Sequence, residues 1–473
     1  MTAGDYSPII TWVKALNTEN QSTMIKDLTS GPIAKTLIVF AFPMLLANLL
    51  QTVYNMVDMV VIGRFVGSAA LSAVSIGTDI IHLPTFIAMG FCNAGQVIVS
   101  QYVGAGDTKS VTRAIGTMFT VLMLGSFVIT AICVTGVDTF LNWMNTPPEA
   151  LVMAKDYSLT CYAGLFFTYG YLLVSAILRG MGDSRHPLIF IAIAAGTNLV
   201  LDLVFVIAFK WGTFGAAFAT VIGQAISFII SIIFLYKRRQ SFGFDFKPKS
   251  FKVDKFILIK FLKLGIPMSL QTVAVNFSVL VVNSNINTYG IVASAVTGIG
   301  LKLSLVTSVI SSSFSTSGAA MIGQCIGAAK TERVPRVMSF SMLVNLAYAT
   351  ALSAITIFLP RQIFGLFNTD PKVLDMAMTF IPCAVLNYYG FAFRSPLFSL
   401  INGIGHAKLN LSVALLDGLI GRIVLALFLG ITVGMGIRGF WYGSSLAGYI
   451  PLALIIPYYL SGKWKTYKLL ISR

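Results

Sequence analysis

Charge-poor apolar segments of roughly 20 or more residues recur along the whole chain, from near residue 34 to near residue 460. Each is long enough to cross a hydrocarbon layer of about 30 Å as a helix, because a helix rises about 1.5 Å per residue. Only 11% of the residues are charged and 56% are hydrophobic, whereas about a quarter are charged in a soluble domain. The sequence therefore excludes a soluble fold and predicts an all-α polytopic membrane protein.

Loop signals divide the apolar sequence into twelve predicted transmembrane helices. Clusters of Gly, Pro and charged residues interrupt the apolar pattern between them. The first six spans are predicted near residues 34–62, 70–99, 113–135, 157–177, 187–209 and 213–236. The other six are predicted near residues 257–284, 291–320, 337–358, 374–402, 410–433 and 437–460.

An internal repeat relates the two sets of six spans. Identical residues recur at a spacing of 223 or 224 positions: Pro43 and Pro267, Gln101 and Gln324, Gly104 and Gly327, Gly180 and Gly403, and Gly215 and Gly439. Because six is an even number, both repeats enter the membrane from the same side, and a pseudo-two-fold axis along the membrane normal relates them. We therefore expect two six-helix bundles that alternate access between the two sides of the membrane.

The chain divides into five predicted regions. These are a cytoplasmic N-terminal segment (1–33), an N-lobe (34–236), a basic cytoplasmic linker (237–256), a C-lobe (257–460) and a basic cytoplasmic tail (461–473). Lys and Arg are divided unevenly between the loops of the two membrane sides, 22 against 6. Because loops rich in Lys and Arg stay in the cytoplasm, both termini are predicted to be cytoplasmic, in a cell inner or plasma membrane.

The net charge of +16 comes from 33 Lys and Arg against 17 Asp and Glu. In a soluble chain such an excess would indicate nucleic acid as a partner. Here the basic residues gather in the loops of one side and at the C-terminus, so anionic membrane lipids account for them. We expect membrane lipids, and no nucleic acid, among the partners.

Signatures of enzymes and metal sites are absent from the sequence. No H-E-x-x-H, G-x-S-x-G or phosphate-loop pattern occurs, and the three histidines, His82, His186 and His406, are far apart in sequence. The cysteines occur singly in apolar stretches, without the paired spacing of a disulfide framework or a metal site: Cys92, Cys133, Cys161, Cys325 and Cys383. We predict no catalytic residue, no metal site and no cofactor.

Acidic residues inside the spans are the strongest functional signal, because a carboxylate at the centre of a bilayer costs several kcal/mol. We place four acids there: Asp58, Asp79, Asp202 and Asp417. In the first span, Gln51, Tyr54 and Asp58 follow at i, i+3 and i+7 and so share one helix face. Earlier in this span, Pro43 is predicted to kink the helix and to free carbonyl groups.

The fifth and sixth spans supply partners for Asp58. Asn198 and Asp202 follow at i and i+4 on one face of the fifth span, and Thr220 lies in the sixth. Two carboxylates in a low-dielectric pocket resist being ionised together, so such a pair can take up and release a proton. Carboxylate, amide and hydroxyl oxygens would equally suit Na⁺. The residues alone leave H⁺ and Na⁺ open as the coupling ion.

Further charges inside the spans also need partners. Asp79 and Lys302 occupy the same place in the two repeats, and they form either an ion pair that closes a gate or two separate contacts with the membrane interface or water. Arg394, Asp417 and Arg422 lie in the tenth and eleventh spans. We expect Arg394 to pair with Asp417, either as structural neutralisation or as a group that holds an anionic part of a substrate.

Several motifs together resemble the multidrug and toxic compound extrusion (MATE) transporters, which are twelve-span antiporters built from two six-helix bundles. The resemblance covers roughly residues 30–460. It rests on the early Pro43 and on five short segments: YNMVDMVVIG with Asp58, SQYVGAGD after the second span, LRGMGD, NLVLD ending in Asp202, and GAAFAT ending in Thr220.

The DinF-like branch of the family is the most similar, and it implies a cation site in the N-lobe. By position, Asp58 would be the carboxylate whose protonation accompanies bending at Pro43, and Asp202, Asn198 and Thr220 would complete the site. The residues assigned to the substrate chamber are Gln51, Tyr54, Asn55 and Ser175. The NorM-like branch has acids in the seventh and tenth spans, which this sequence lacks, so a cation site of that kind in the C-lobe is not expected.

The sequence thus predicts a secondary transporter and not an enzyme. We expect efflux of amphipathic, often cationic, organic compounds by a monomer, driven by inward movement of H⁺ or Na⁺. The alternative is a flippase for a lipid-linked precursor, since the wider superfamily includes such proteins. A flippase would need a basic central cavity, for which Arg394, Arg422 and Lys302 are the available residues.

Overall fold

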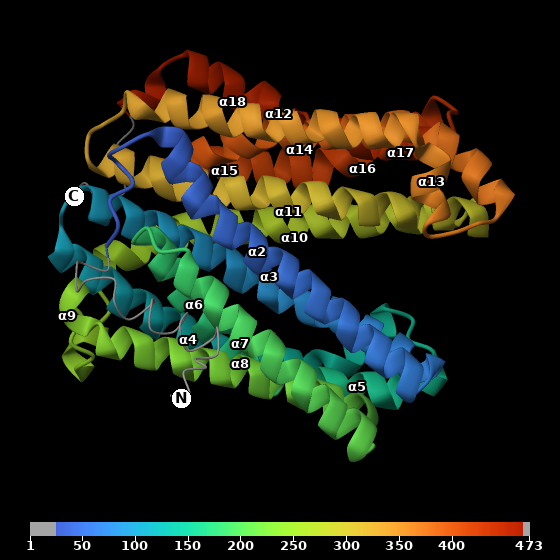
Figure 1. Ribbon diagram of the computed structural model, residues 1–473, viewed down its shortest axis with the longest axis horizontal. Helices are drawn as coiled ribbons and strands as arrows, with labels where there is room; N and C mark the ends of the chain where they lie inside the picture. The colour runs from blue at the N-terminus through green and yellow to red at the C-terminus, as the bar shows by residue number, and fades with distance from the viewer. Residues whose placement is uncertain (1–24, 467–473) are drawn as a thin grey trace, which may run out of the picture.

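The computed structural model describes residues 25–466, apart from the side chain of Phe242, and the regular structure in this part of the chain is helical (Figure 1). The N-lobe consists of α2 (Ile33–Phe65), α3 (Ser68–Gly104), α4 (Thr108–Trp143), α5 (Pro148–Ala163), α6 (Leu165–Gly180), α7 (Arg185–Asp202), η1 (Leu203–Ala208) and α8 (Gly212–Lys237). The linker carries α9 (Arg239–Phe242) and η2 (Pro248–Phe251). Residues 1–24 and 467–473, and the predictions that fall on them, lie outside the described part.

The C-lobe repeats the arrangement of the N-lobe. It consists of α10 (Lys255–Asn287), α11 (Ile291–Gly327), α12 (Arg333–Phe358), α13 (Pro360–Gly365), α14 (Pro371–Gly403), α15 (Ala407–Val413), η3 (Ala414–Gly421), α16 (Arg422–Leu427), η4 (Phe428–Thr432), α17 (Ile437–Ala447) and α18 (Ile450–Leu460). A short turn, η5 (Lys463–Lys465), follows the last span. Eleven helical segments of the described residues are long and apolar enough to span a membrane, and the bent pair α5–α6 makes the twelfth.

The fourth span differs from its prediction. It begins at Pro148 and not near residue 157, and α5 and α6 meet at an angle of 49° around Gly164. A side chain at Gly164 would have its Cβ 2.6 Å from Val221, so α8 lies against this break. Lys155 and Asp156 made the first part of the span look like a loop, because charged residues were used to mark the loops.

Matched turns support the duplication. Left-handed backbone conformations recur at equivalent places in the two lobes, at Gly67 and Gly290, Gly106 and Ala329, Gly182 and Gly405, and Gly212 and Gly436. Seven of these eight residues are glycines, which adopt a positive φ without steric cost. The shared turn geometry shows that the repeat seen in the sequence is a repeat of structure.

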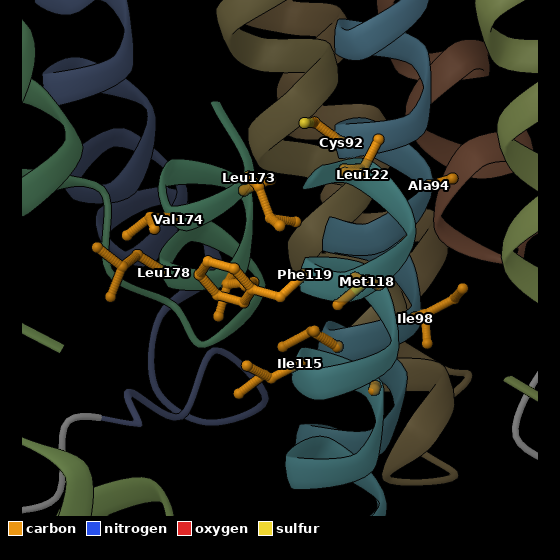
Figure 2. Packing of buried hydrophobic residues seen from close by; sticks show 14 of the residues in the cluster. Cys92, Ala94, Ile98, Ile115, Met118, Phe119, Leu122, Leu173, Val174 and Leu178 are labelled. Atoms are coloured by element: carbon orange, nitrogen blue, oxygen red, sulfur yellow. The ribbon is translucent and has the colours of Figure 1, made fainter. Parts of the chain in front are cut away.

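The N-lobe core lies where α3, α4 and α6 meet. Figure 2 shows side chains from the three helices interdigitating: Cys92, Ala94 and Ile98, then Ile115, Met118, Phe119 and Leu122, and Leu173, Val174 and Leu178. The same cluster continues into α10 of the C-lobe through Phe261 and Leu264. All five cysteines of the chain are buried and unpaired.

The two lobes meet at the end of the molecule that carries the linker, here named the linker end, and their helices diverge toward the opposite, far end (Figure 1). At the linker end Gln101 donates its side-chain N–H to the carbonyl of Gly403 at 2.9 Å. Gln324, its repeat counterpart, donates to the carbonyl of Gly180 at 3.1 Å. The two hydrogen bonds that join the lobes are therefore related by the pseudo-two-fold axis.

Two glycines allow this close approach. A Cβ added at Gly104 would lie 2.1 Å from the carbonyl oxygen of Gln324, and one added at Gly327 would lie 2.1 Å from that of Gln101. Both glycines are helical, and the crowding atoms belong to the backbone of the other lobe. Glycine is thus required at both positions for the lobes to touch.

Two segments that lead into the lobes complete the linker end. The N-terminal arm, residues 25–31, leads into the N-lobe but contacts the C-lobe, where the N–H of Leu28 donates to Gln324 Oε1 at 2.9 Å and Arg333 donates to the carbonyl of Gly31 at 2.9 Å. The linker arm, residues 250–254, leads into the C-lobe but contacts α4 of the N-lobe. There Thr120 donates to the carbonyl of Phe251 at 2.7 Å.

Candidate functional site

A pocket of about 170 Å³ lies inside the N-lobe, among α2, α3, α5, α6 and α8. We call it the N-lobe pocket. Its polar lining residues are Gln51, Tyr54, Asn55, Asp58, Thr78, His82, Thr85, Tyr157, Thr168, Thr220 and Gln224. Apolar side chains such as Met59 and Leu165 complete the wall. A site with this lining suits a mostly apolar ligand that carries a few polar or charged groups.

The polar face of α2 forms one wall of the N-lobe pocket. Gln51, Tyr54, Asn55 and Asp58 all line it, as their shared helix face requires. Pro43 lies inside α2 and is buried, and the helix continues on both sides of it. Three of the four residues assigned to the substrate chamber are thus brought together.

Asp58 and Asp202 form the centre of the site. Their carboxyl groups lie within hydrogen-bonding reach of each other, with Asp58 on the pocket wall and Asp202 buried behind it. Neither oxygen of Asp202 receives a hydrogen bond from another group among residues 25–466. Because two carboxylates repel and have no donors of their own, the pair needs a shared proton or a bound cation.

Asn198 and Thr220 border this pair. Asn198 donates its Nδ2–H to Thr220 Oγ1 at 3.2 Å, and Thr220 donates in turn to the carbonyl of Ala216 at 3.0 Å. This leaves Asn198 Oδ1 buried without a donor from the described residues. The four side chains therefore offer carboxylate, amide and hydroxyl oxygens from three helices, α2, α7 and α8, which are ligands that Na⁺ accepts as well as groups that can hold a proton.

The backbone changes its winding directly after Asp202. Residues Leu203–Ala208 form a π-helical turn, in which the N–H of Phe209 donates to the carbonyl of Val204, five residues back. π-Helical turns are rare and occur often at functional sites. The turn ends the α-helical part of the fifth span at the residue that faces Asp58.

Ser175 lies apart from the rest of the assigned chamber. It is buried in α6 and does not line the N-lobe pocket, whereas Thr168 of the same helix does. The two residues share a helix face, but Ser175 lies about 10 Å further along the axis toward the linker end. The helical spacing in the sequence predicts on which face of α6 a residue lies, but not how far along the helix the pocket extends.

Sequence reasoning missed the α3 wall of the pocket. Thr78, His82 and Thr85 line it at i, i+4 and i+7, a spacing that places all three on one helix face. Tyr157 and Gln224 also line the pocket from α5 and α8. The helical spacing of the α3 residues is the signal that would have found them, although each is uncharged or weakly basic.

Asp79 and Lys302 are not brought together. Both side chains are exposed, and no ion pair joins them in the part of the chain that the structure describes. The Lys302 ammonium instead lies 5.7 Å from the centre of the Phe367 ring. Both residues lie in the parts of α3 and α11 nearer the far end, where the lobes diverge, so this conformation agrees with the alternative of two separate contacts and not with an ion pair.

The C-lobe charges do form a cluster. Arg394 Nη1 lies 3.1 Å from Asp417 Oδ2, and Arg422 Nη2 lies 3.6 Å from Asp417 Oδ1. Arg422 also donates to the carbonyl of Ser444 at 3.3 Å, and the Arg394 guanidinium lies 4.7 Å from the Phe398 ring. Asp417 is fully buried, so it neutralises charge inside the lobe.

Comparisons with known proteins show which family has this architecture. The family model described as MatE matches residues 43–204 and 267–428, once in each lobe. The probable multidrug resistance protein YpnP of Bacillus subtilis is 28% identical over 94% of this chain and 99% of its own length. The probable multidrug resistance protein YoeA of the same organism is 25% identical over 93% and 96%. The multidrug export protein MepA of Staphylococcus aureus is 25% identical over 84% and 87%.

Solved structures share the fold. The outward-facing conformation of a multidrug resistance MATE family transporter of the MOP superfamily superposes with a TM-score of 0.86, at 19% identity, over 95% of this chain and all of the other. A MOP superfamily transporter from Pyrococcus furiosus gives a TM-score of 0.85 at 20% identity, over the same shares. With one family unit in each lobe and twelve membrane-spanning helices, the chain belongs to the MATE family of multidrug efflux transporters and is not an enzyme.

Proposed function

We propose that the protein exports amphipathic, often cationic, organic compounds in exchange for H⁺ or Na⁺, and that Asp58 and Asp202 bind the coupling ion. The observation that carries this proposal is the pair of carboxyl groups that share one site at membrane depth, with Asp58 on the wall of the N-lobe pocket. The names of the relatives, which include multidrug resistance and multidrug export proteins, support the class of substrate.

Competition between the organic substrate and the coupling ion for Asp58 would couple their movements across the membrane. An organic cation in the N-lobe pocket would lie against the Asp58 carboxylate and near the rings of Tyr54 and Tyr157, which offer apolar and cation-π contact. A proton or Na⁺ at Asp58 removes the negative charge that favours this cation. Each ligand therefore weakens binding of the other by the same factor, as linkage requires, and an inward ion gradient drives outward release.

The distribution of basic residues supports a cytoplasmic linker end. Among residues 25–466, this end carries 19 of the Lys and Arg that the sequence assigns to one membrane side, against 6 on the other side. With both termini cytoplasmic, the conformation described here is closed toward the cytoplasm and is the one that would release substrate outside. Because one chain contains both lobes, we propose that a monomer in the cell membrane suffices for transport.

Either ion suits the oxygen ligands, and the position of the pair in the N-lobe favours the DinF-like branch. The flippase alternative is not favoured. Of the three basic residues on which it depended, Arg394 and Arg422 are bound to Asp417, and neither they nor Lys302 line the N-lobe pocket.

Dye transport in proteoliposomes tests the proposal. Ethidium movement would be followed with a proton gradient and a sodium gradient imposed separately, for the wild type, Asp58→Asn and Asp202→Asn. We expect one gradient to drive transport in the wild type and neither to drive it in the two variants. Asp375→Asn is the matched control, because Asp375 is also an acid in a helix long enough to span the membrane, but it is exposed and lies in α14 of the other lobe.

Two results would refute this assignment. Gradient-driven transport that survives in both Asp58→Asn and Asp202→Asn would exclude the pair as the coupling site. Equal loss in Asp375→Asn would mean that the substitutions act on folding or on net charge and not on the site. Size-exclusion profiles of the purified variants would separate these two causes.

A further inference from the structure

A second pocket, of about 250 Å³, lies at the linker end of the N-lobe. It is enclosed by the N-terminal arm, the first two turns of α2 and the turn between α6 and α7. This arm pocket is distinct from the N-lobe pocket, with which it shares no residue. Nothing in the proposed antiport uses it.

Three basic side chains line the arm pocket: Lys26 from the arm, Lys35 from α2 and Arg185 from the start of α7. Lys26 and Lys35 are exposed and form no ion pair within residues 25–466. The single acid in the lining is Asp27, whose carboxylate accepts a hydrogen bond from the N–H of Thr29 at 2.7 Å. The pocket is therefore positively charged and suits an anion.

The neighbouring acid neutralises this charge only in part, because His186 acts on it more strongly than Lys26 does. Asp183 precedes α7 and is buried, and it pairs with the ring of His186. The same carboxylate accepts hydrogen bonds from the N–H groups of Arg185 at 3.0 Å and His186 at 3.3 Å. The first N–H groups of α7 are thus occupied, so side-chain charge and not the helix terminus would hold an anion here.

The pocket continues onto an apolar surface. Val39 and Phe40 form part of its lining, and Val39 lies one helical turn beyond Lys35 on the same face of α2. Val39 is 50% exposed, and Phe42, three residues further, is 54% exposed. A basic head group site therefore opens directly onto an exposed apolar helix face, which is the arrangement that fits a phospholipid and not a free anion.

We propose that the arm pocket binds the phosphate of an anionic phospholipid from the leaflet at the linker end, and that an acyl chain of this lipid lies along Val39 and Phe42. The lysines supply the charge that selects an anionic over a zwitterionic lipid. Lipid at this place contacts both the arm and α2, so it stabilises the arm in its seated position.

Native mass spectrometry of the purified full-length protein tests the site. Phosphatidylglycerol and phosphatidylcholine would be added to the detergent-solubilised wild type and to Lys26→Gln/Lys35→Gln. We expect the double variant to bind phosphatidylglycerol about 25-fold more weakly, since each lysine near an anionic surface contributes about fivefold to affinity. Binding of phosphatidylcholine is expected to stay unchanged. Lys249→Gln/Lys252→Gln removes the same charge from exposed linker residues at the same end and is the matched control.

Glycerol 3-phosphate and Val39→Asn test separately whether the bound phosphate belongs to a lipid or to a soluble compound. We expect Val39→Asn to weaken phosphatidylglycerol binding, and glycerol 3-phosphate to compete poorly. Strong competition by glycerol 3-phosphate, with no effect of Val39→Asn, would replace the lipid by a soluble phosphate compound. Equal loss of lipid in the control, or equal binding of the two lipids by the wild type, would overturn the site altogether.

Discussion

Replacing Gly327 by Ala should open the linker end. The new Cβ would lie 2.1 Å from the carbonyl oxygen of Gln101, whereas ordinary contact begins near 3.4 Å, so the lobes must part by about 1.3 Å at this place. The crowding atoms are backbone and cannot rotate away. Such a shift would break the bonds of Gln101 to Gly403 and of Gln324 to Gly180, now 2.9 and 3.1 Å long.

The size of the effect follows from those two hydrogen bonds. Each contributes about 1 kcal/mol net, so their loss disfavours the closed linker end by about 2 kcal/mol. A change of that size shifts the ratio of closed to open molecules about 30-fold. Spin labels at Lys109→Cys and Arg336→Cys, one on each lobe at the linker end, would report the distance between lobes by double electron–electron resonance after removal of the native cysteines.

The control for this prediction is Gly298→Ala, a helical glycine of the same helix, α11, whose added Cβ would meet nothing within 4 Å. We expect a longer-distance population in Gly327→Ala and none in Gly298→Ala. Gln101→Ala/Gln324→Ala removes the same two bonds without a steric clash, and it should give a longer-distance population of similar size. Unchanged distances in both Gly327→Ala and the glutamine double variant would refute the role of these contacts.

Two further predictions concern stability. Burial alone would raise the pKa of Asp183, but hydrogen bonding and the charge of His186 hold it below its usual value. The contribution of Asp183 to stability is therefore present above the ordinary pKa of about 3.9 and is lost as pH falls through the pKa of the folded state. Asp183→Asn should lower Tm at neutral pH and make Tm depend less on pH on the acid side. Equal Tm values of the variant and the wild type at pH 7 would contradict this. Asp417→Asn leaves partly buried Arg394 and buried Arg422 without a carboxylate and should cost about 3–5 kcal/mol, whereas Asp375→Asn, which breaks an exposed pair, should cost at most about 1 kcal/mol in thermal unfolding. Similar losses in the two variants would show that the buried arginines are neutralised in another way.

Much of the fold could be predicted from the sequence because membrane spans and repeats leave strong linear signals. The polar face with Gln51, Tyr54 and Asp58 was predicted correctly as one wall, since helical spacing fixes which side chains share a face. The break at Gly164 was not predicted, because a glycine in an apolar run marks a bend only when a neighbouring helix makes use of it.

What the sequence left undecided depends on depth and on conformation. Ser175 shares a face with a pocket residue but lies further along the helix, and periodicity carries no information about where a pocket ends. Asp79 and Lys302 occupy equivalent positions, yet repeat equivalence does not imply contact, and here the lobes are apart at that end. Gln101 and Gln324 were identified as repeat markers, but only the structure shows that they cross between the lobes.

Each of the two arms at the linker end is bonded to the lobe that it does not lead into, and the N-terminal arm also bonds its own lobe through the N–H of Lys26 and the carbonyl of Met181. The N-terminal arm precedes the N-lobe and is held by Gln324 and Arg333 of the C-lobe, while the linker arm precedes the C-lobe and is held by Thr120 of the N-lobe. Because each arm is joined to one lobe by the chain and to the other by hydrogen bonds, the two arms tether the lobes to each other. While both arms remain seated, the lobes can separate at the linker end only as far as the arms allow, and wider opening requires both arms to detach, so the fold itself sets a limit on the amplitude of the motion.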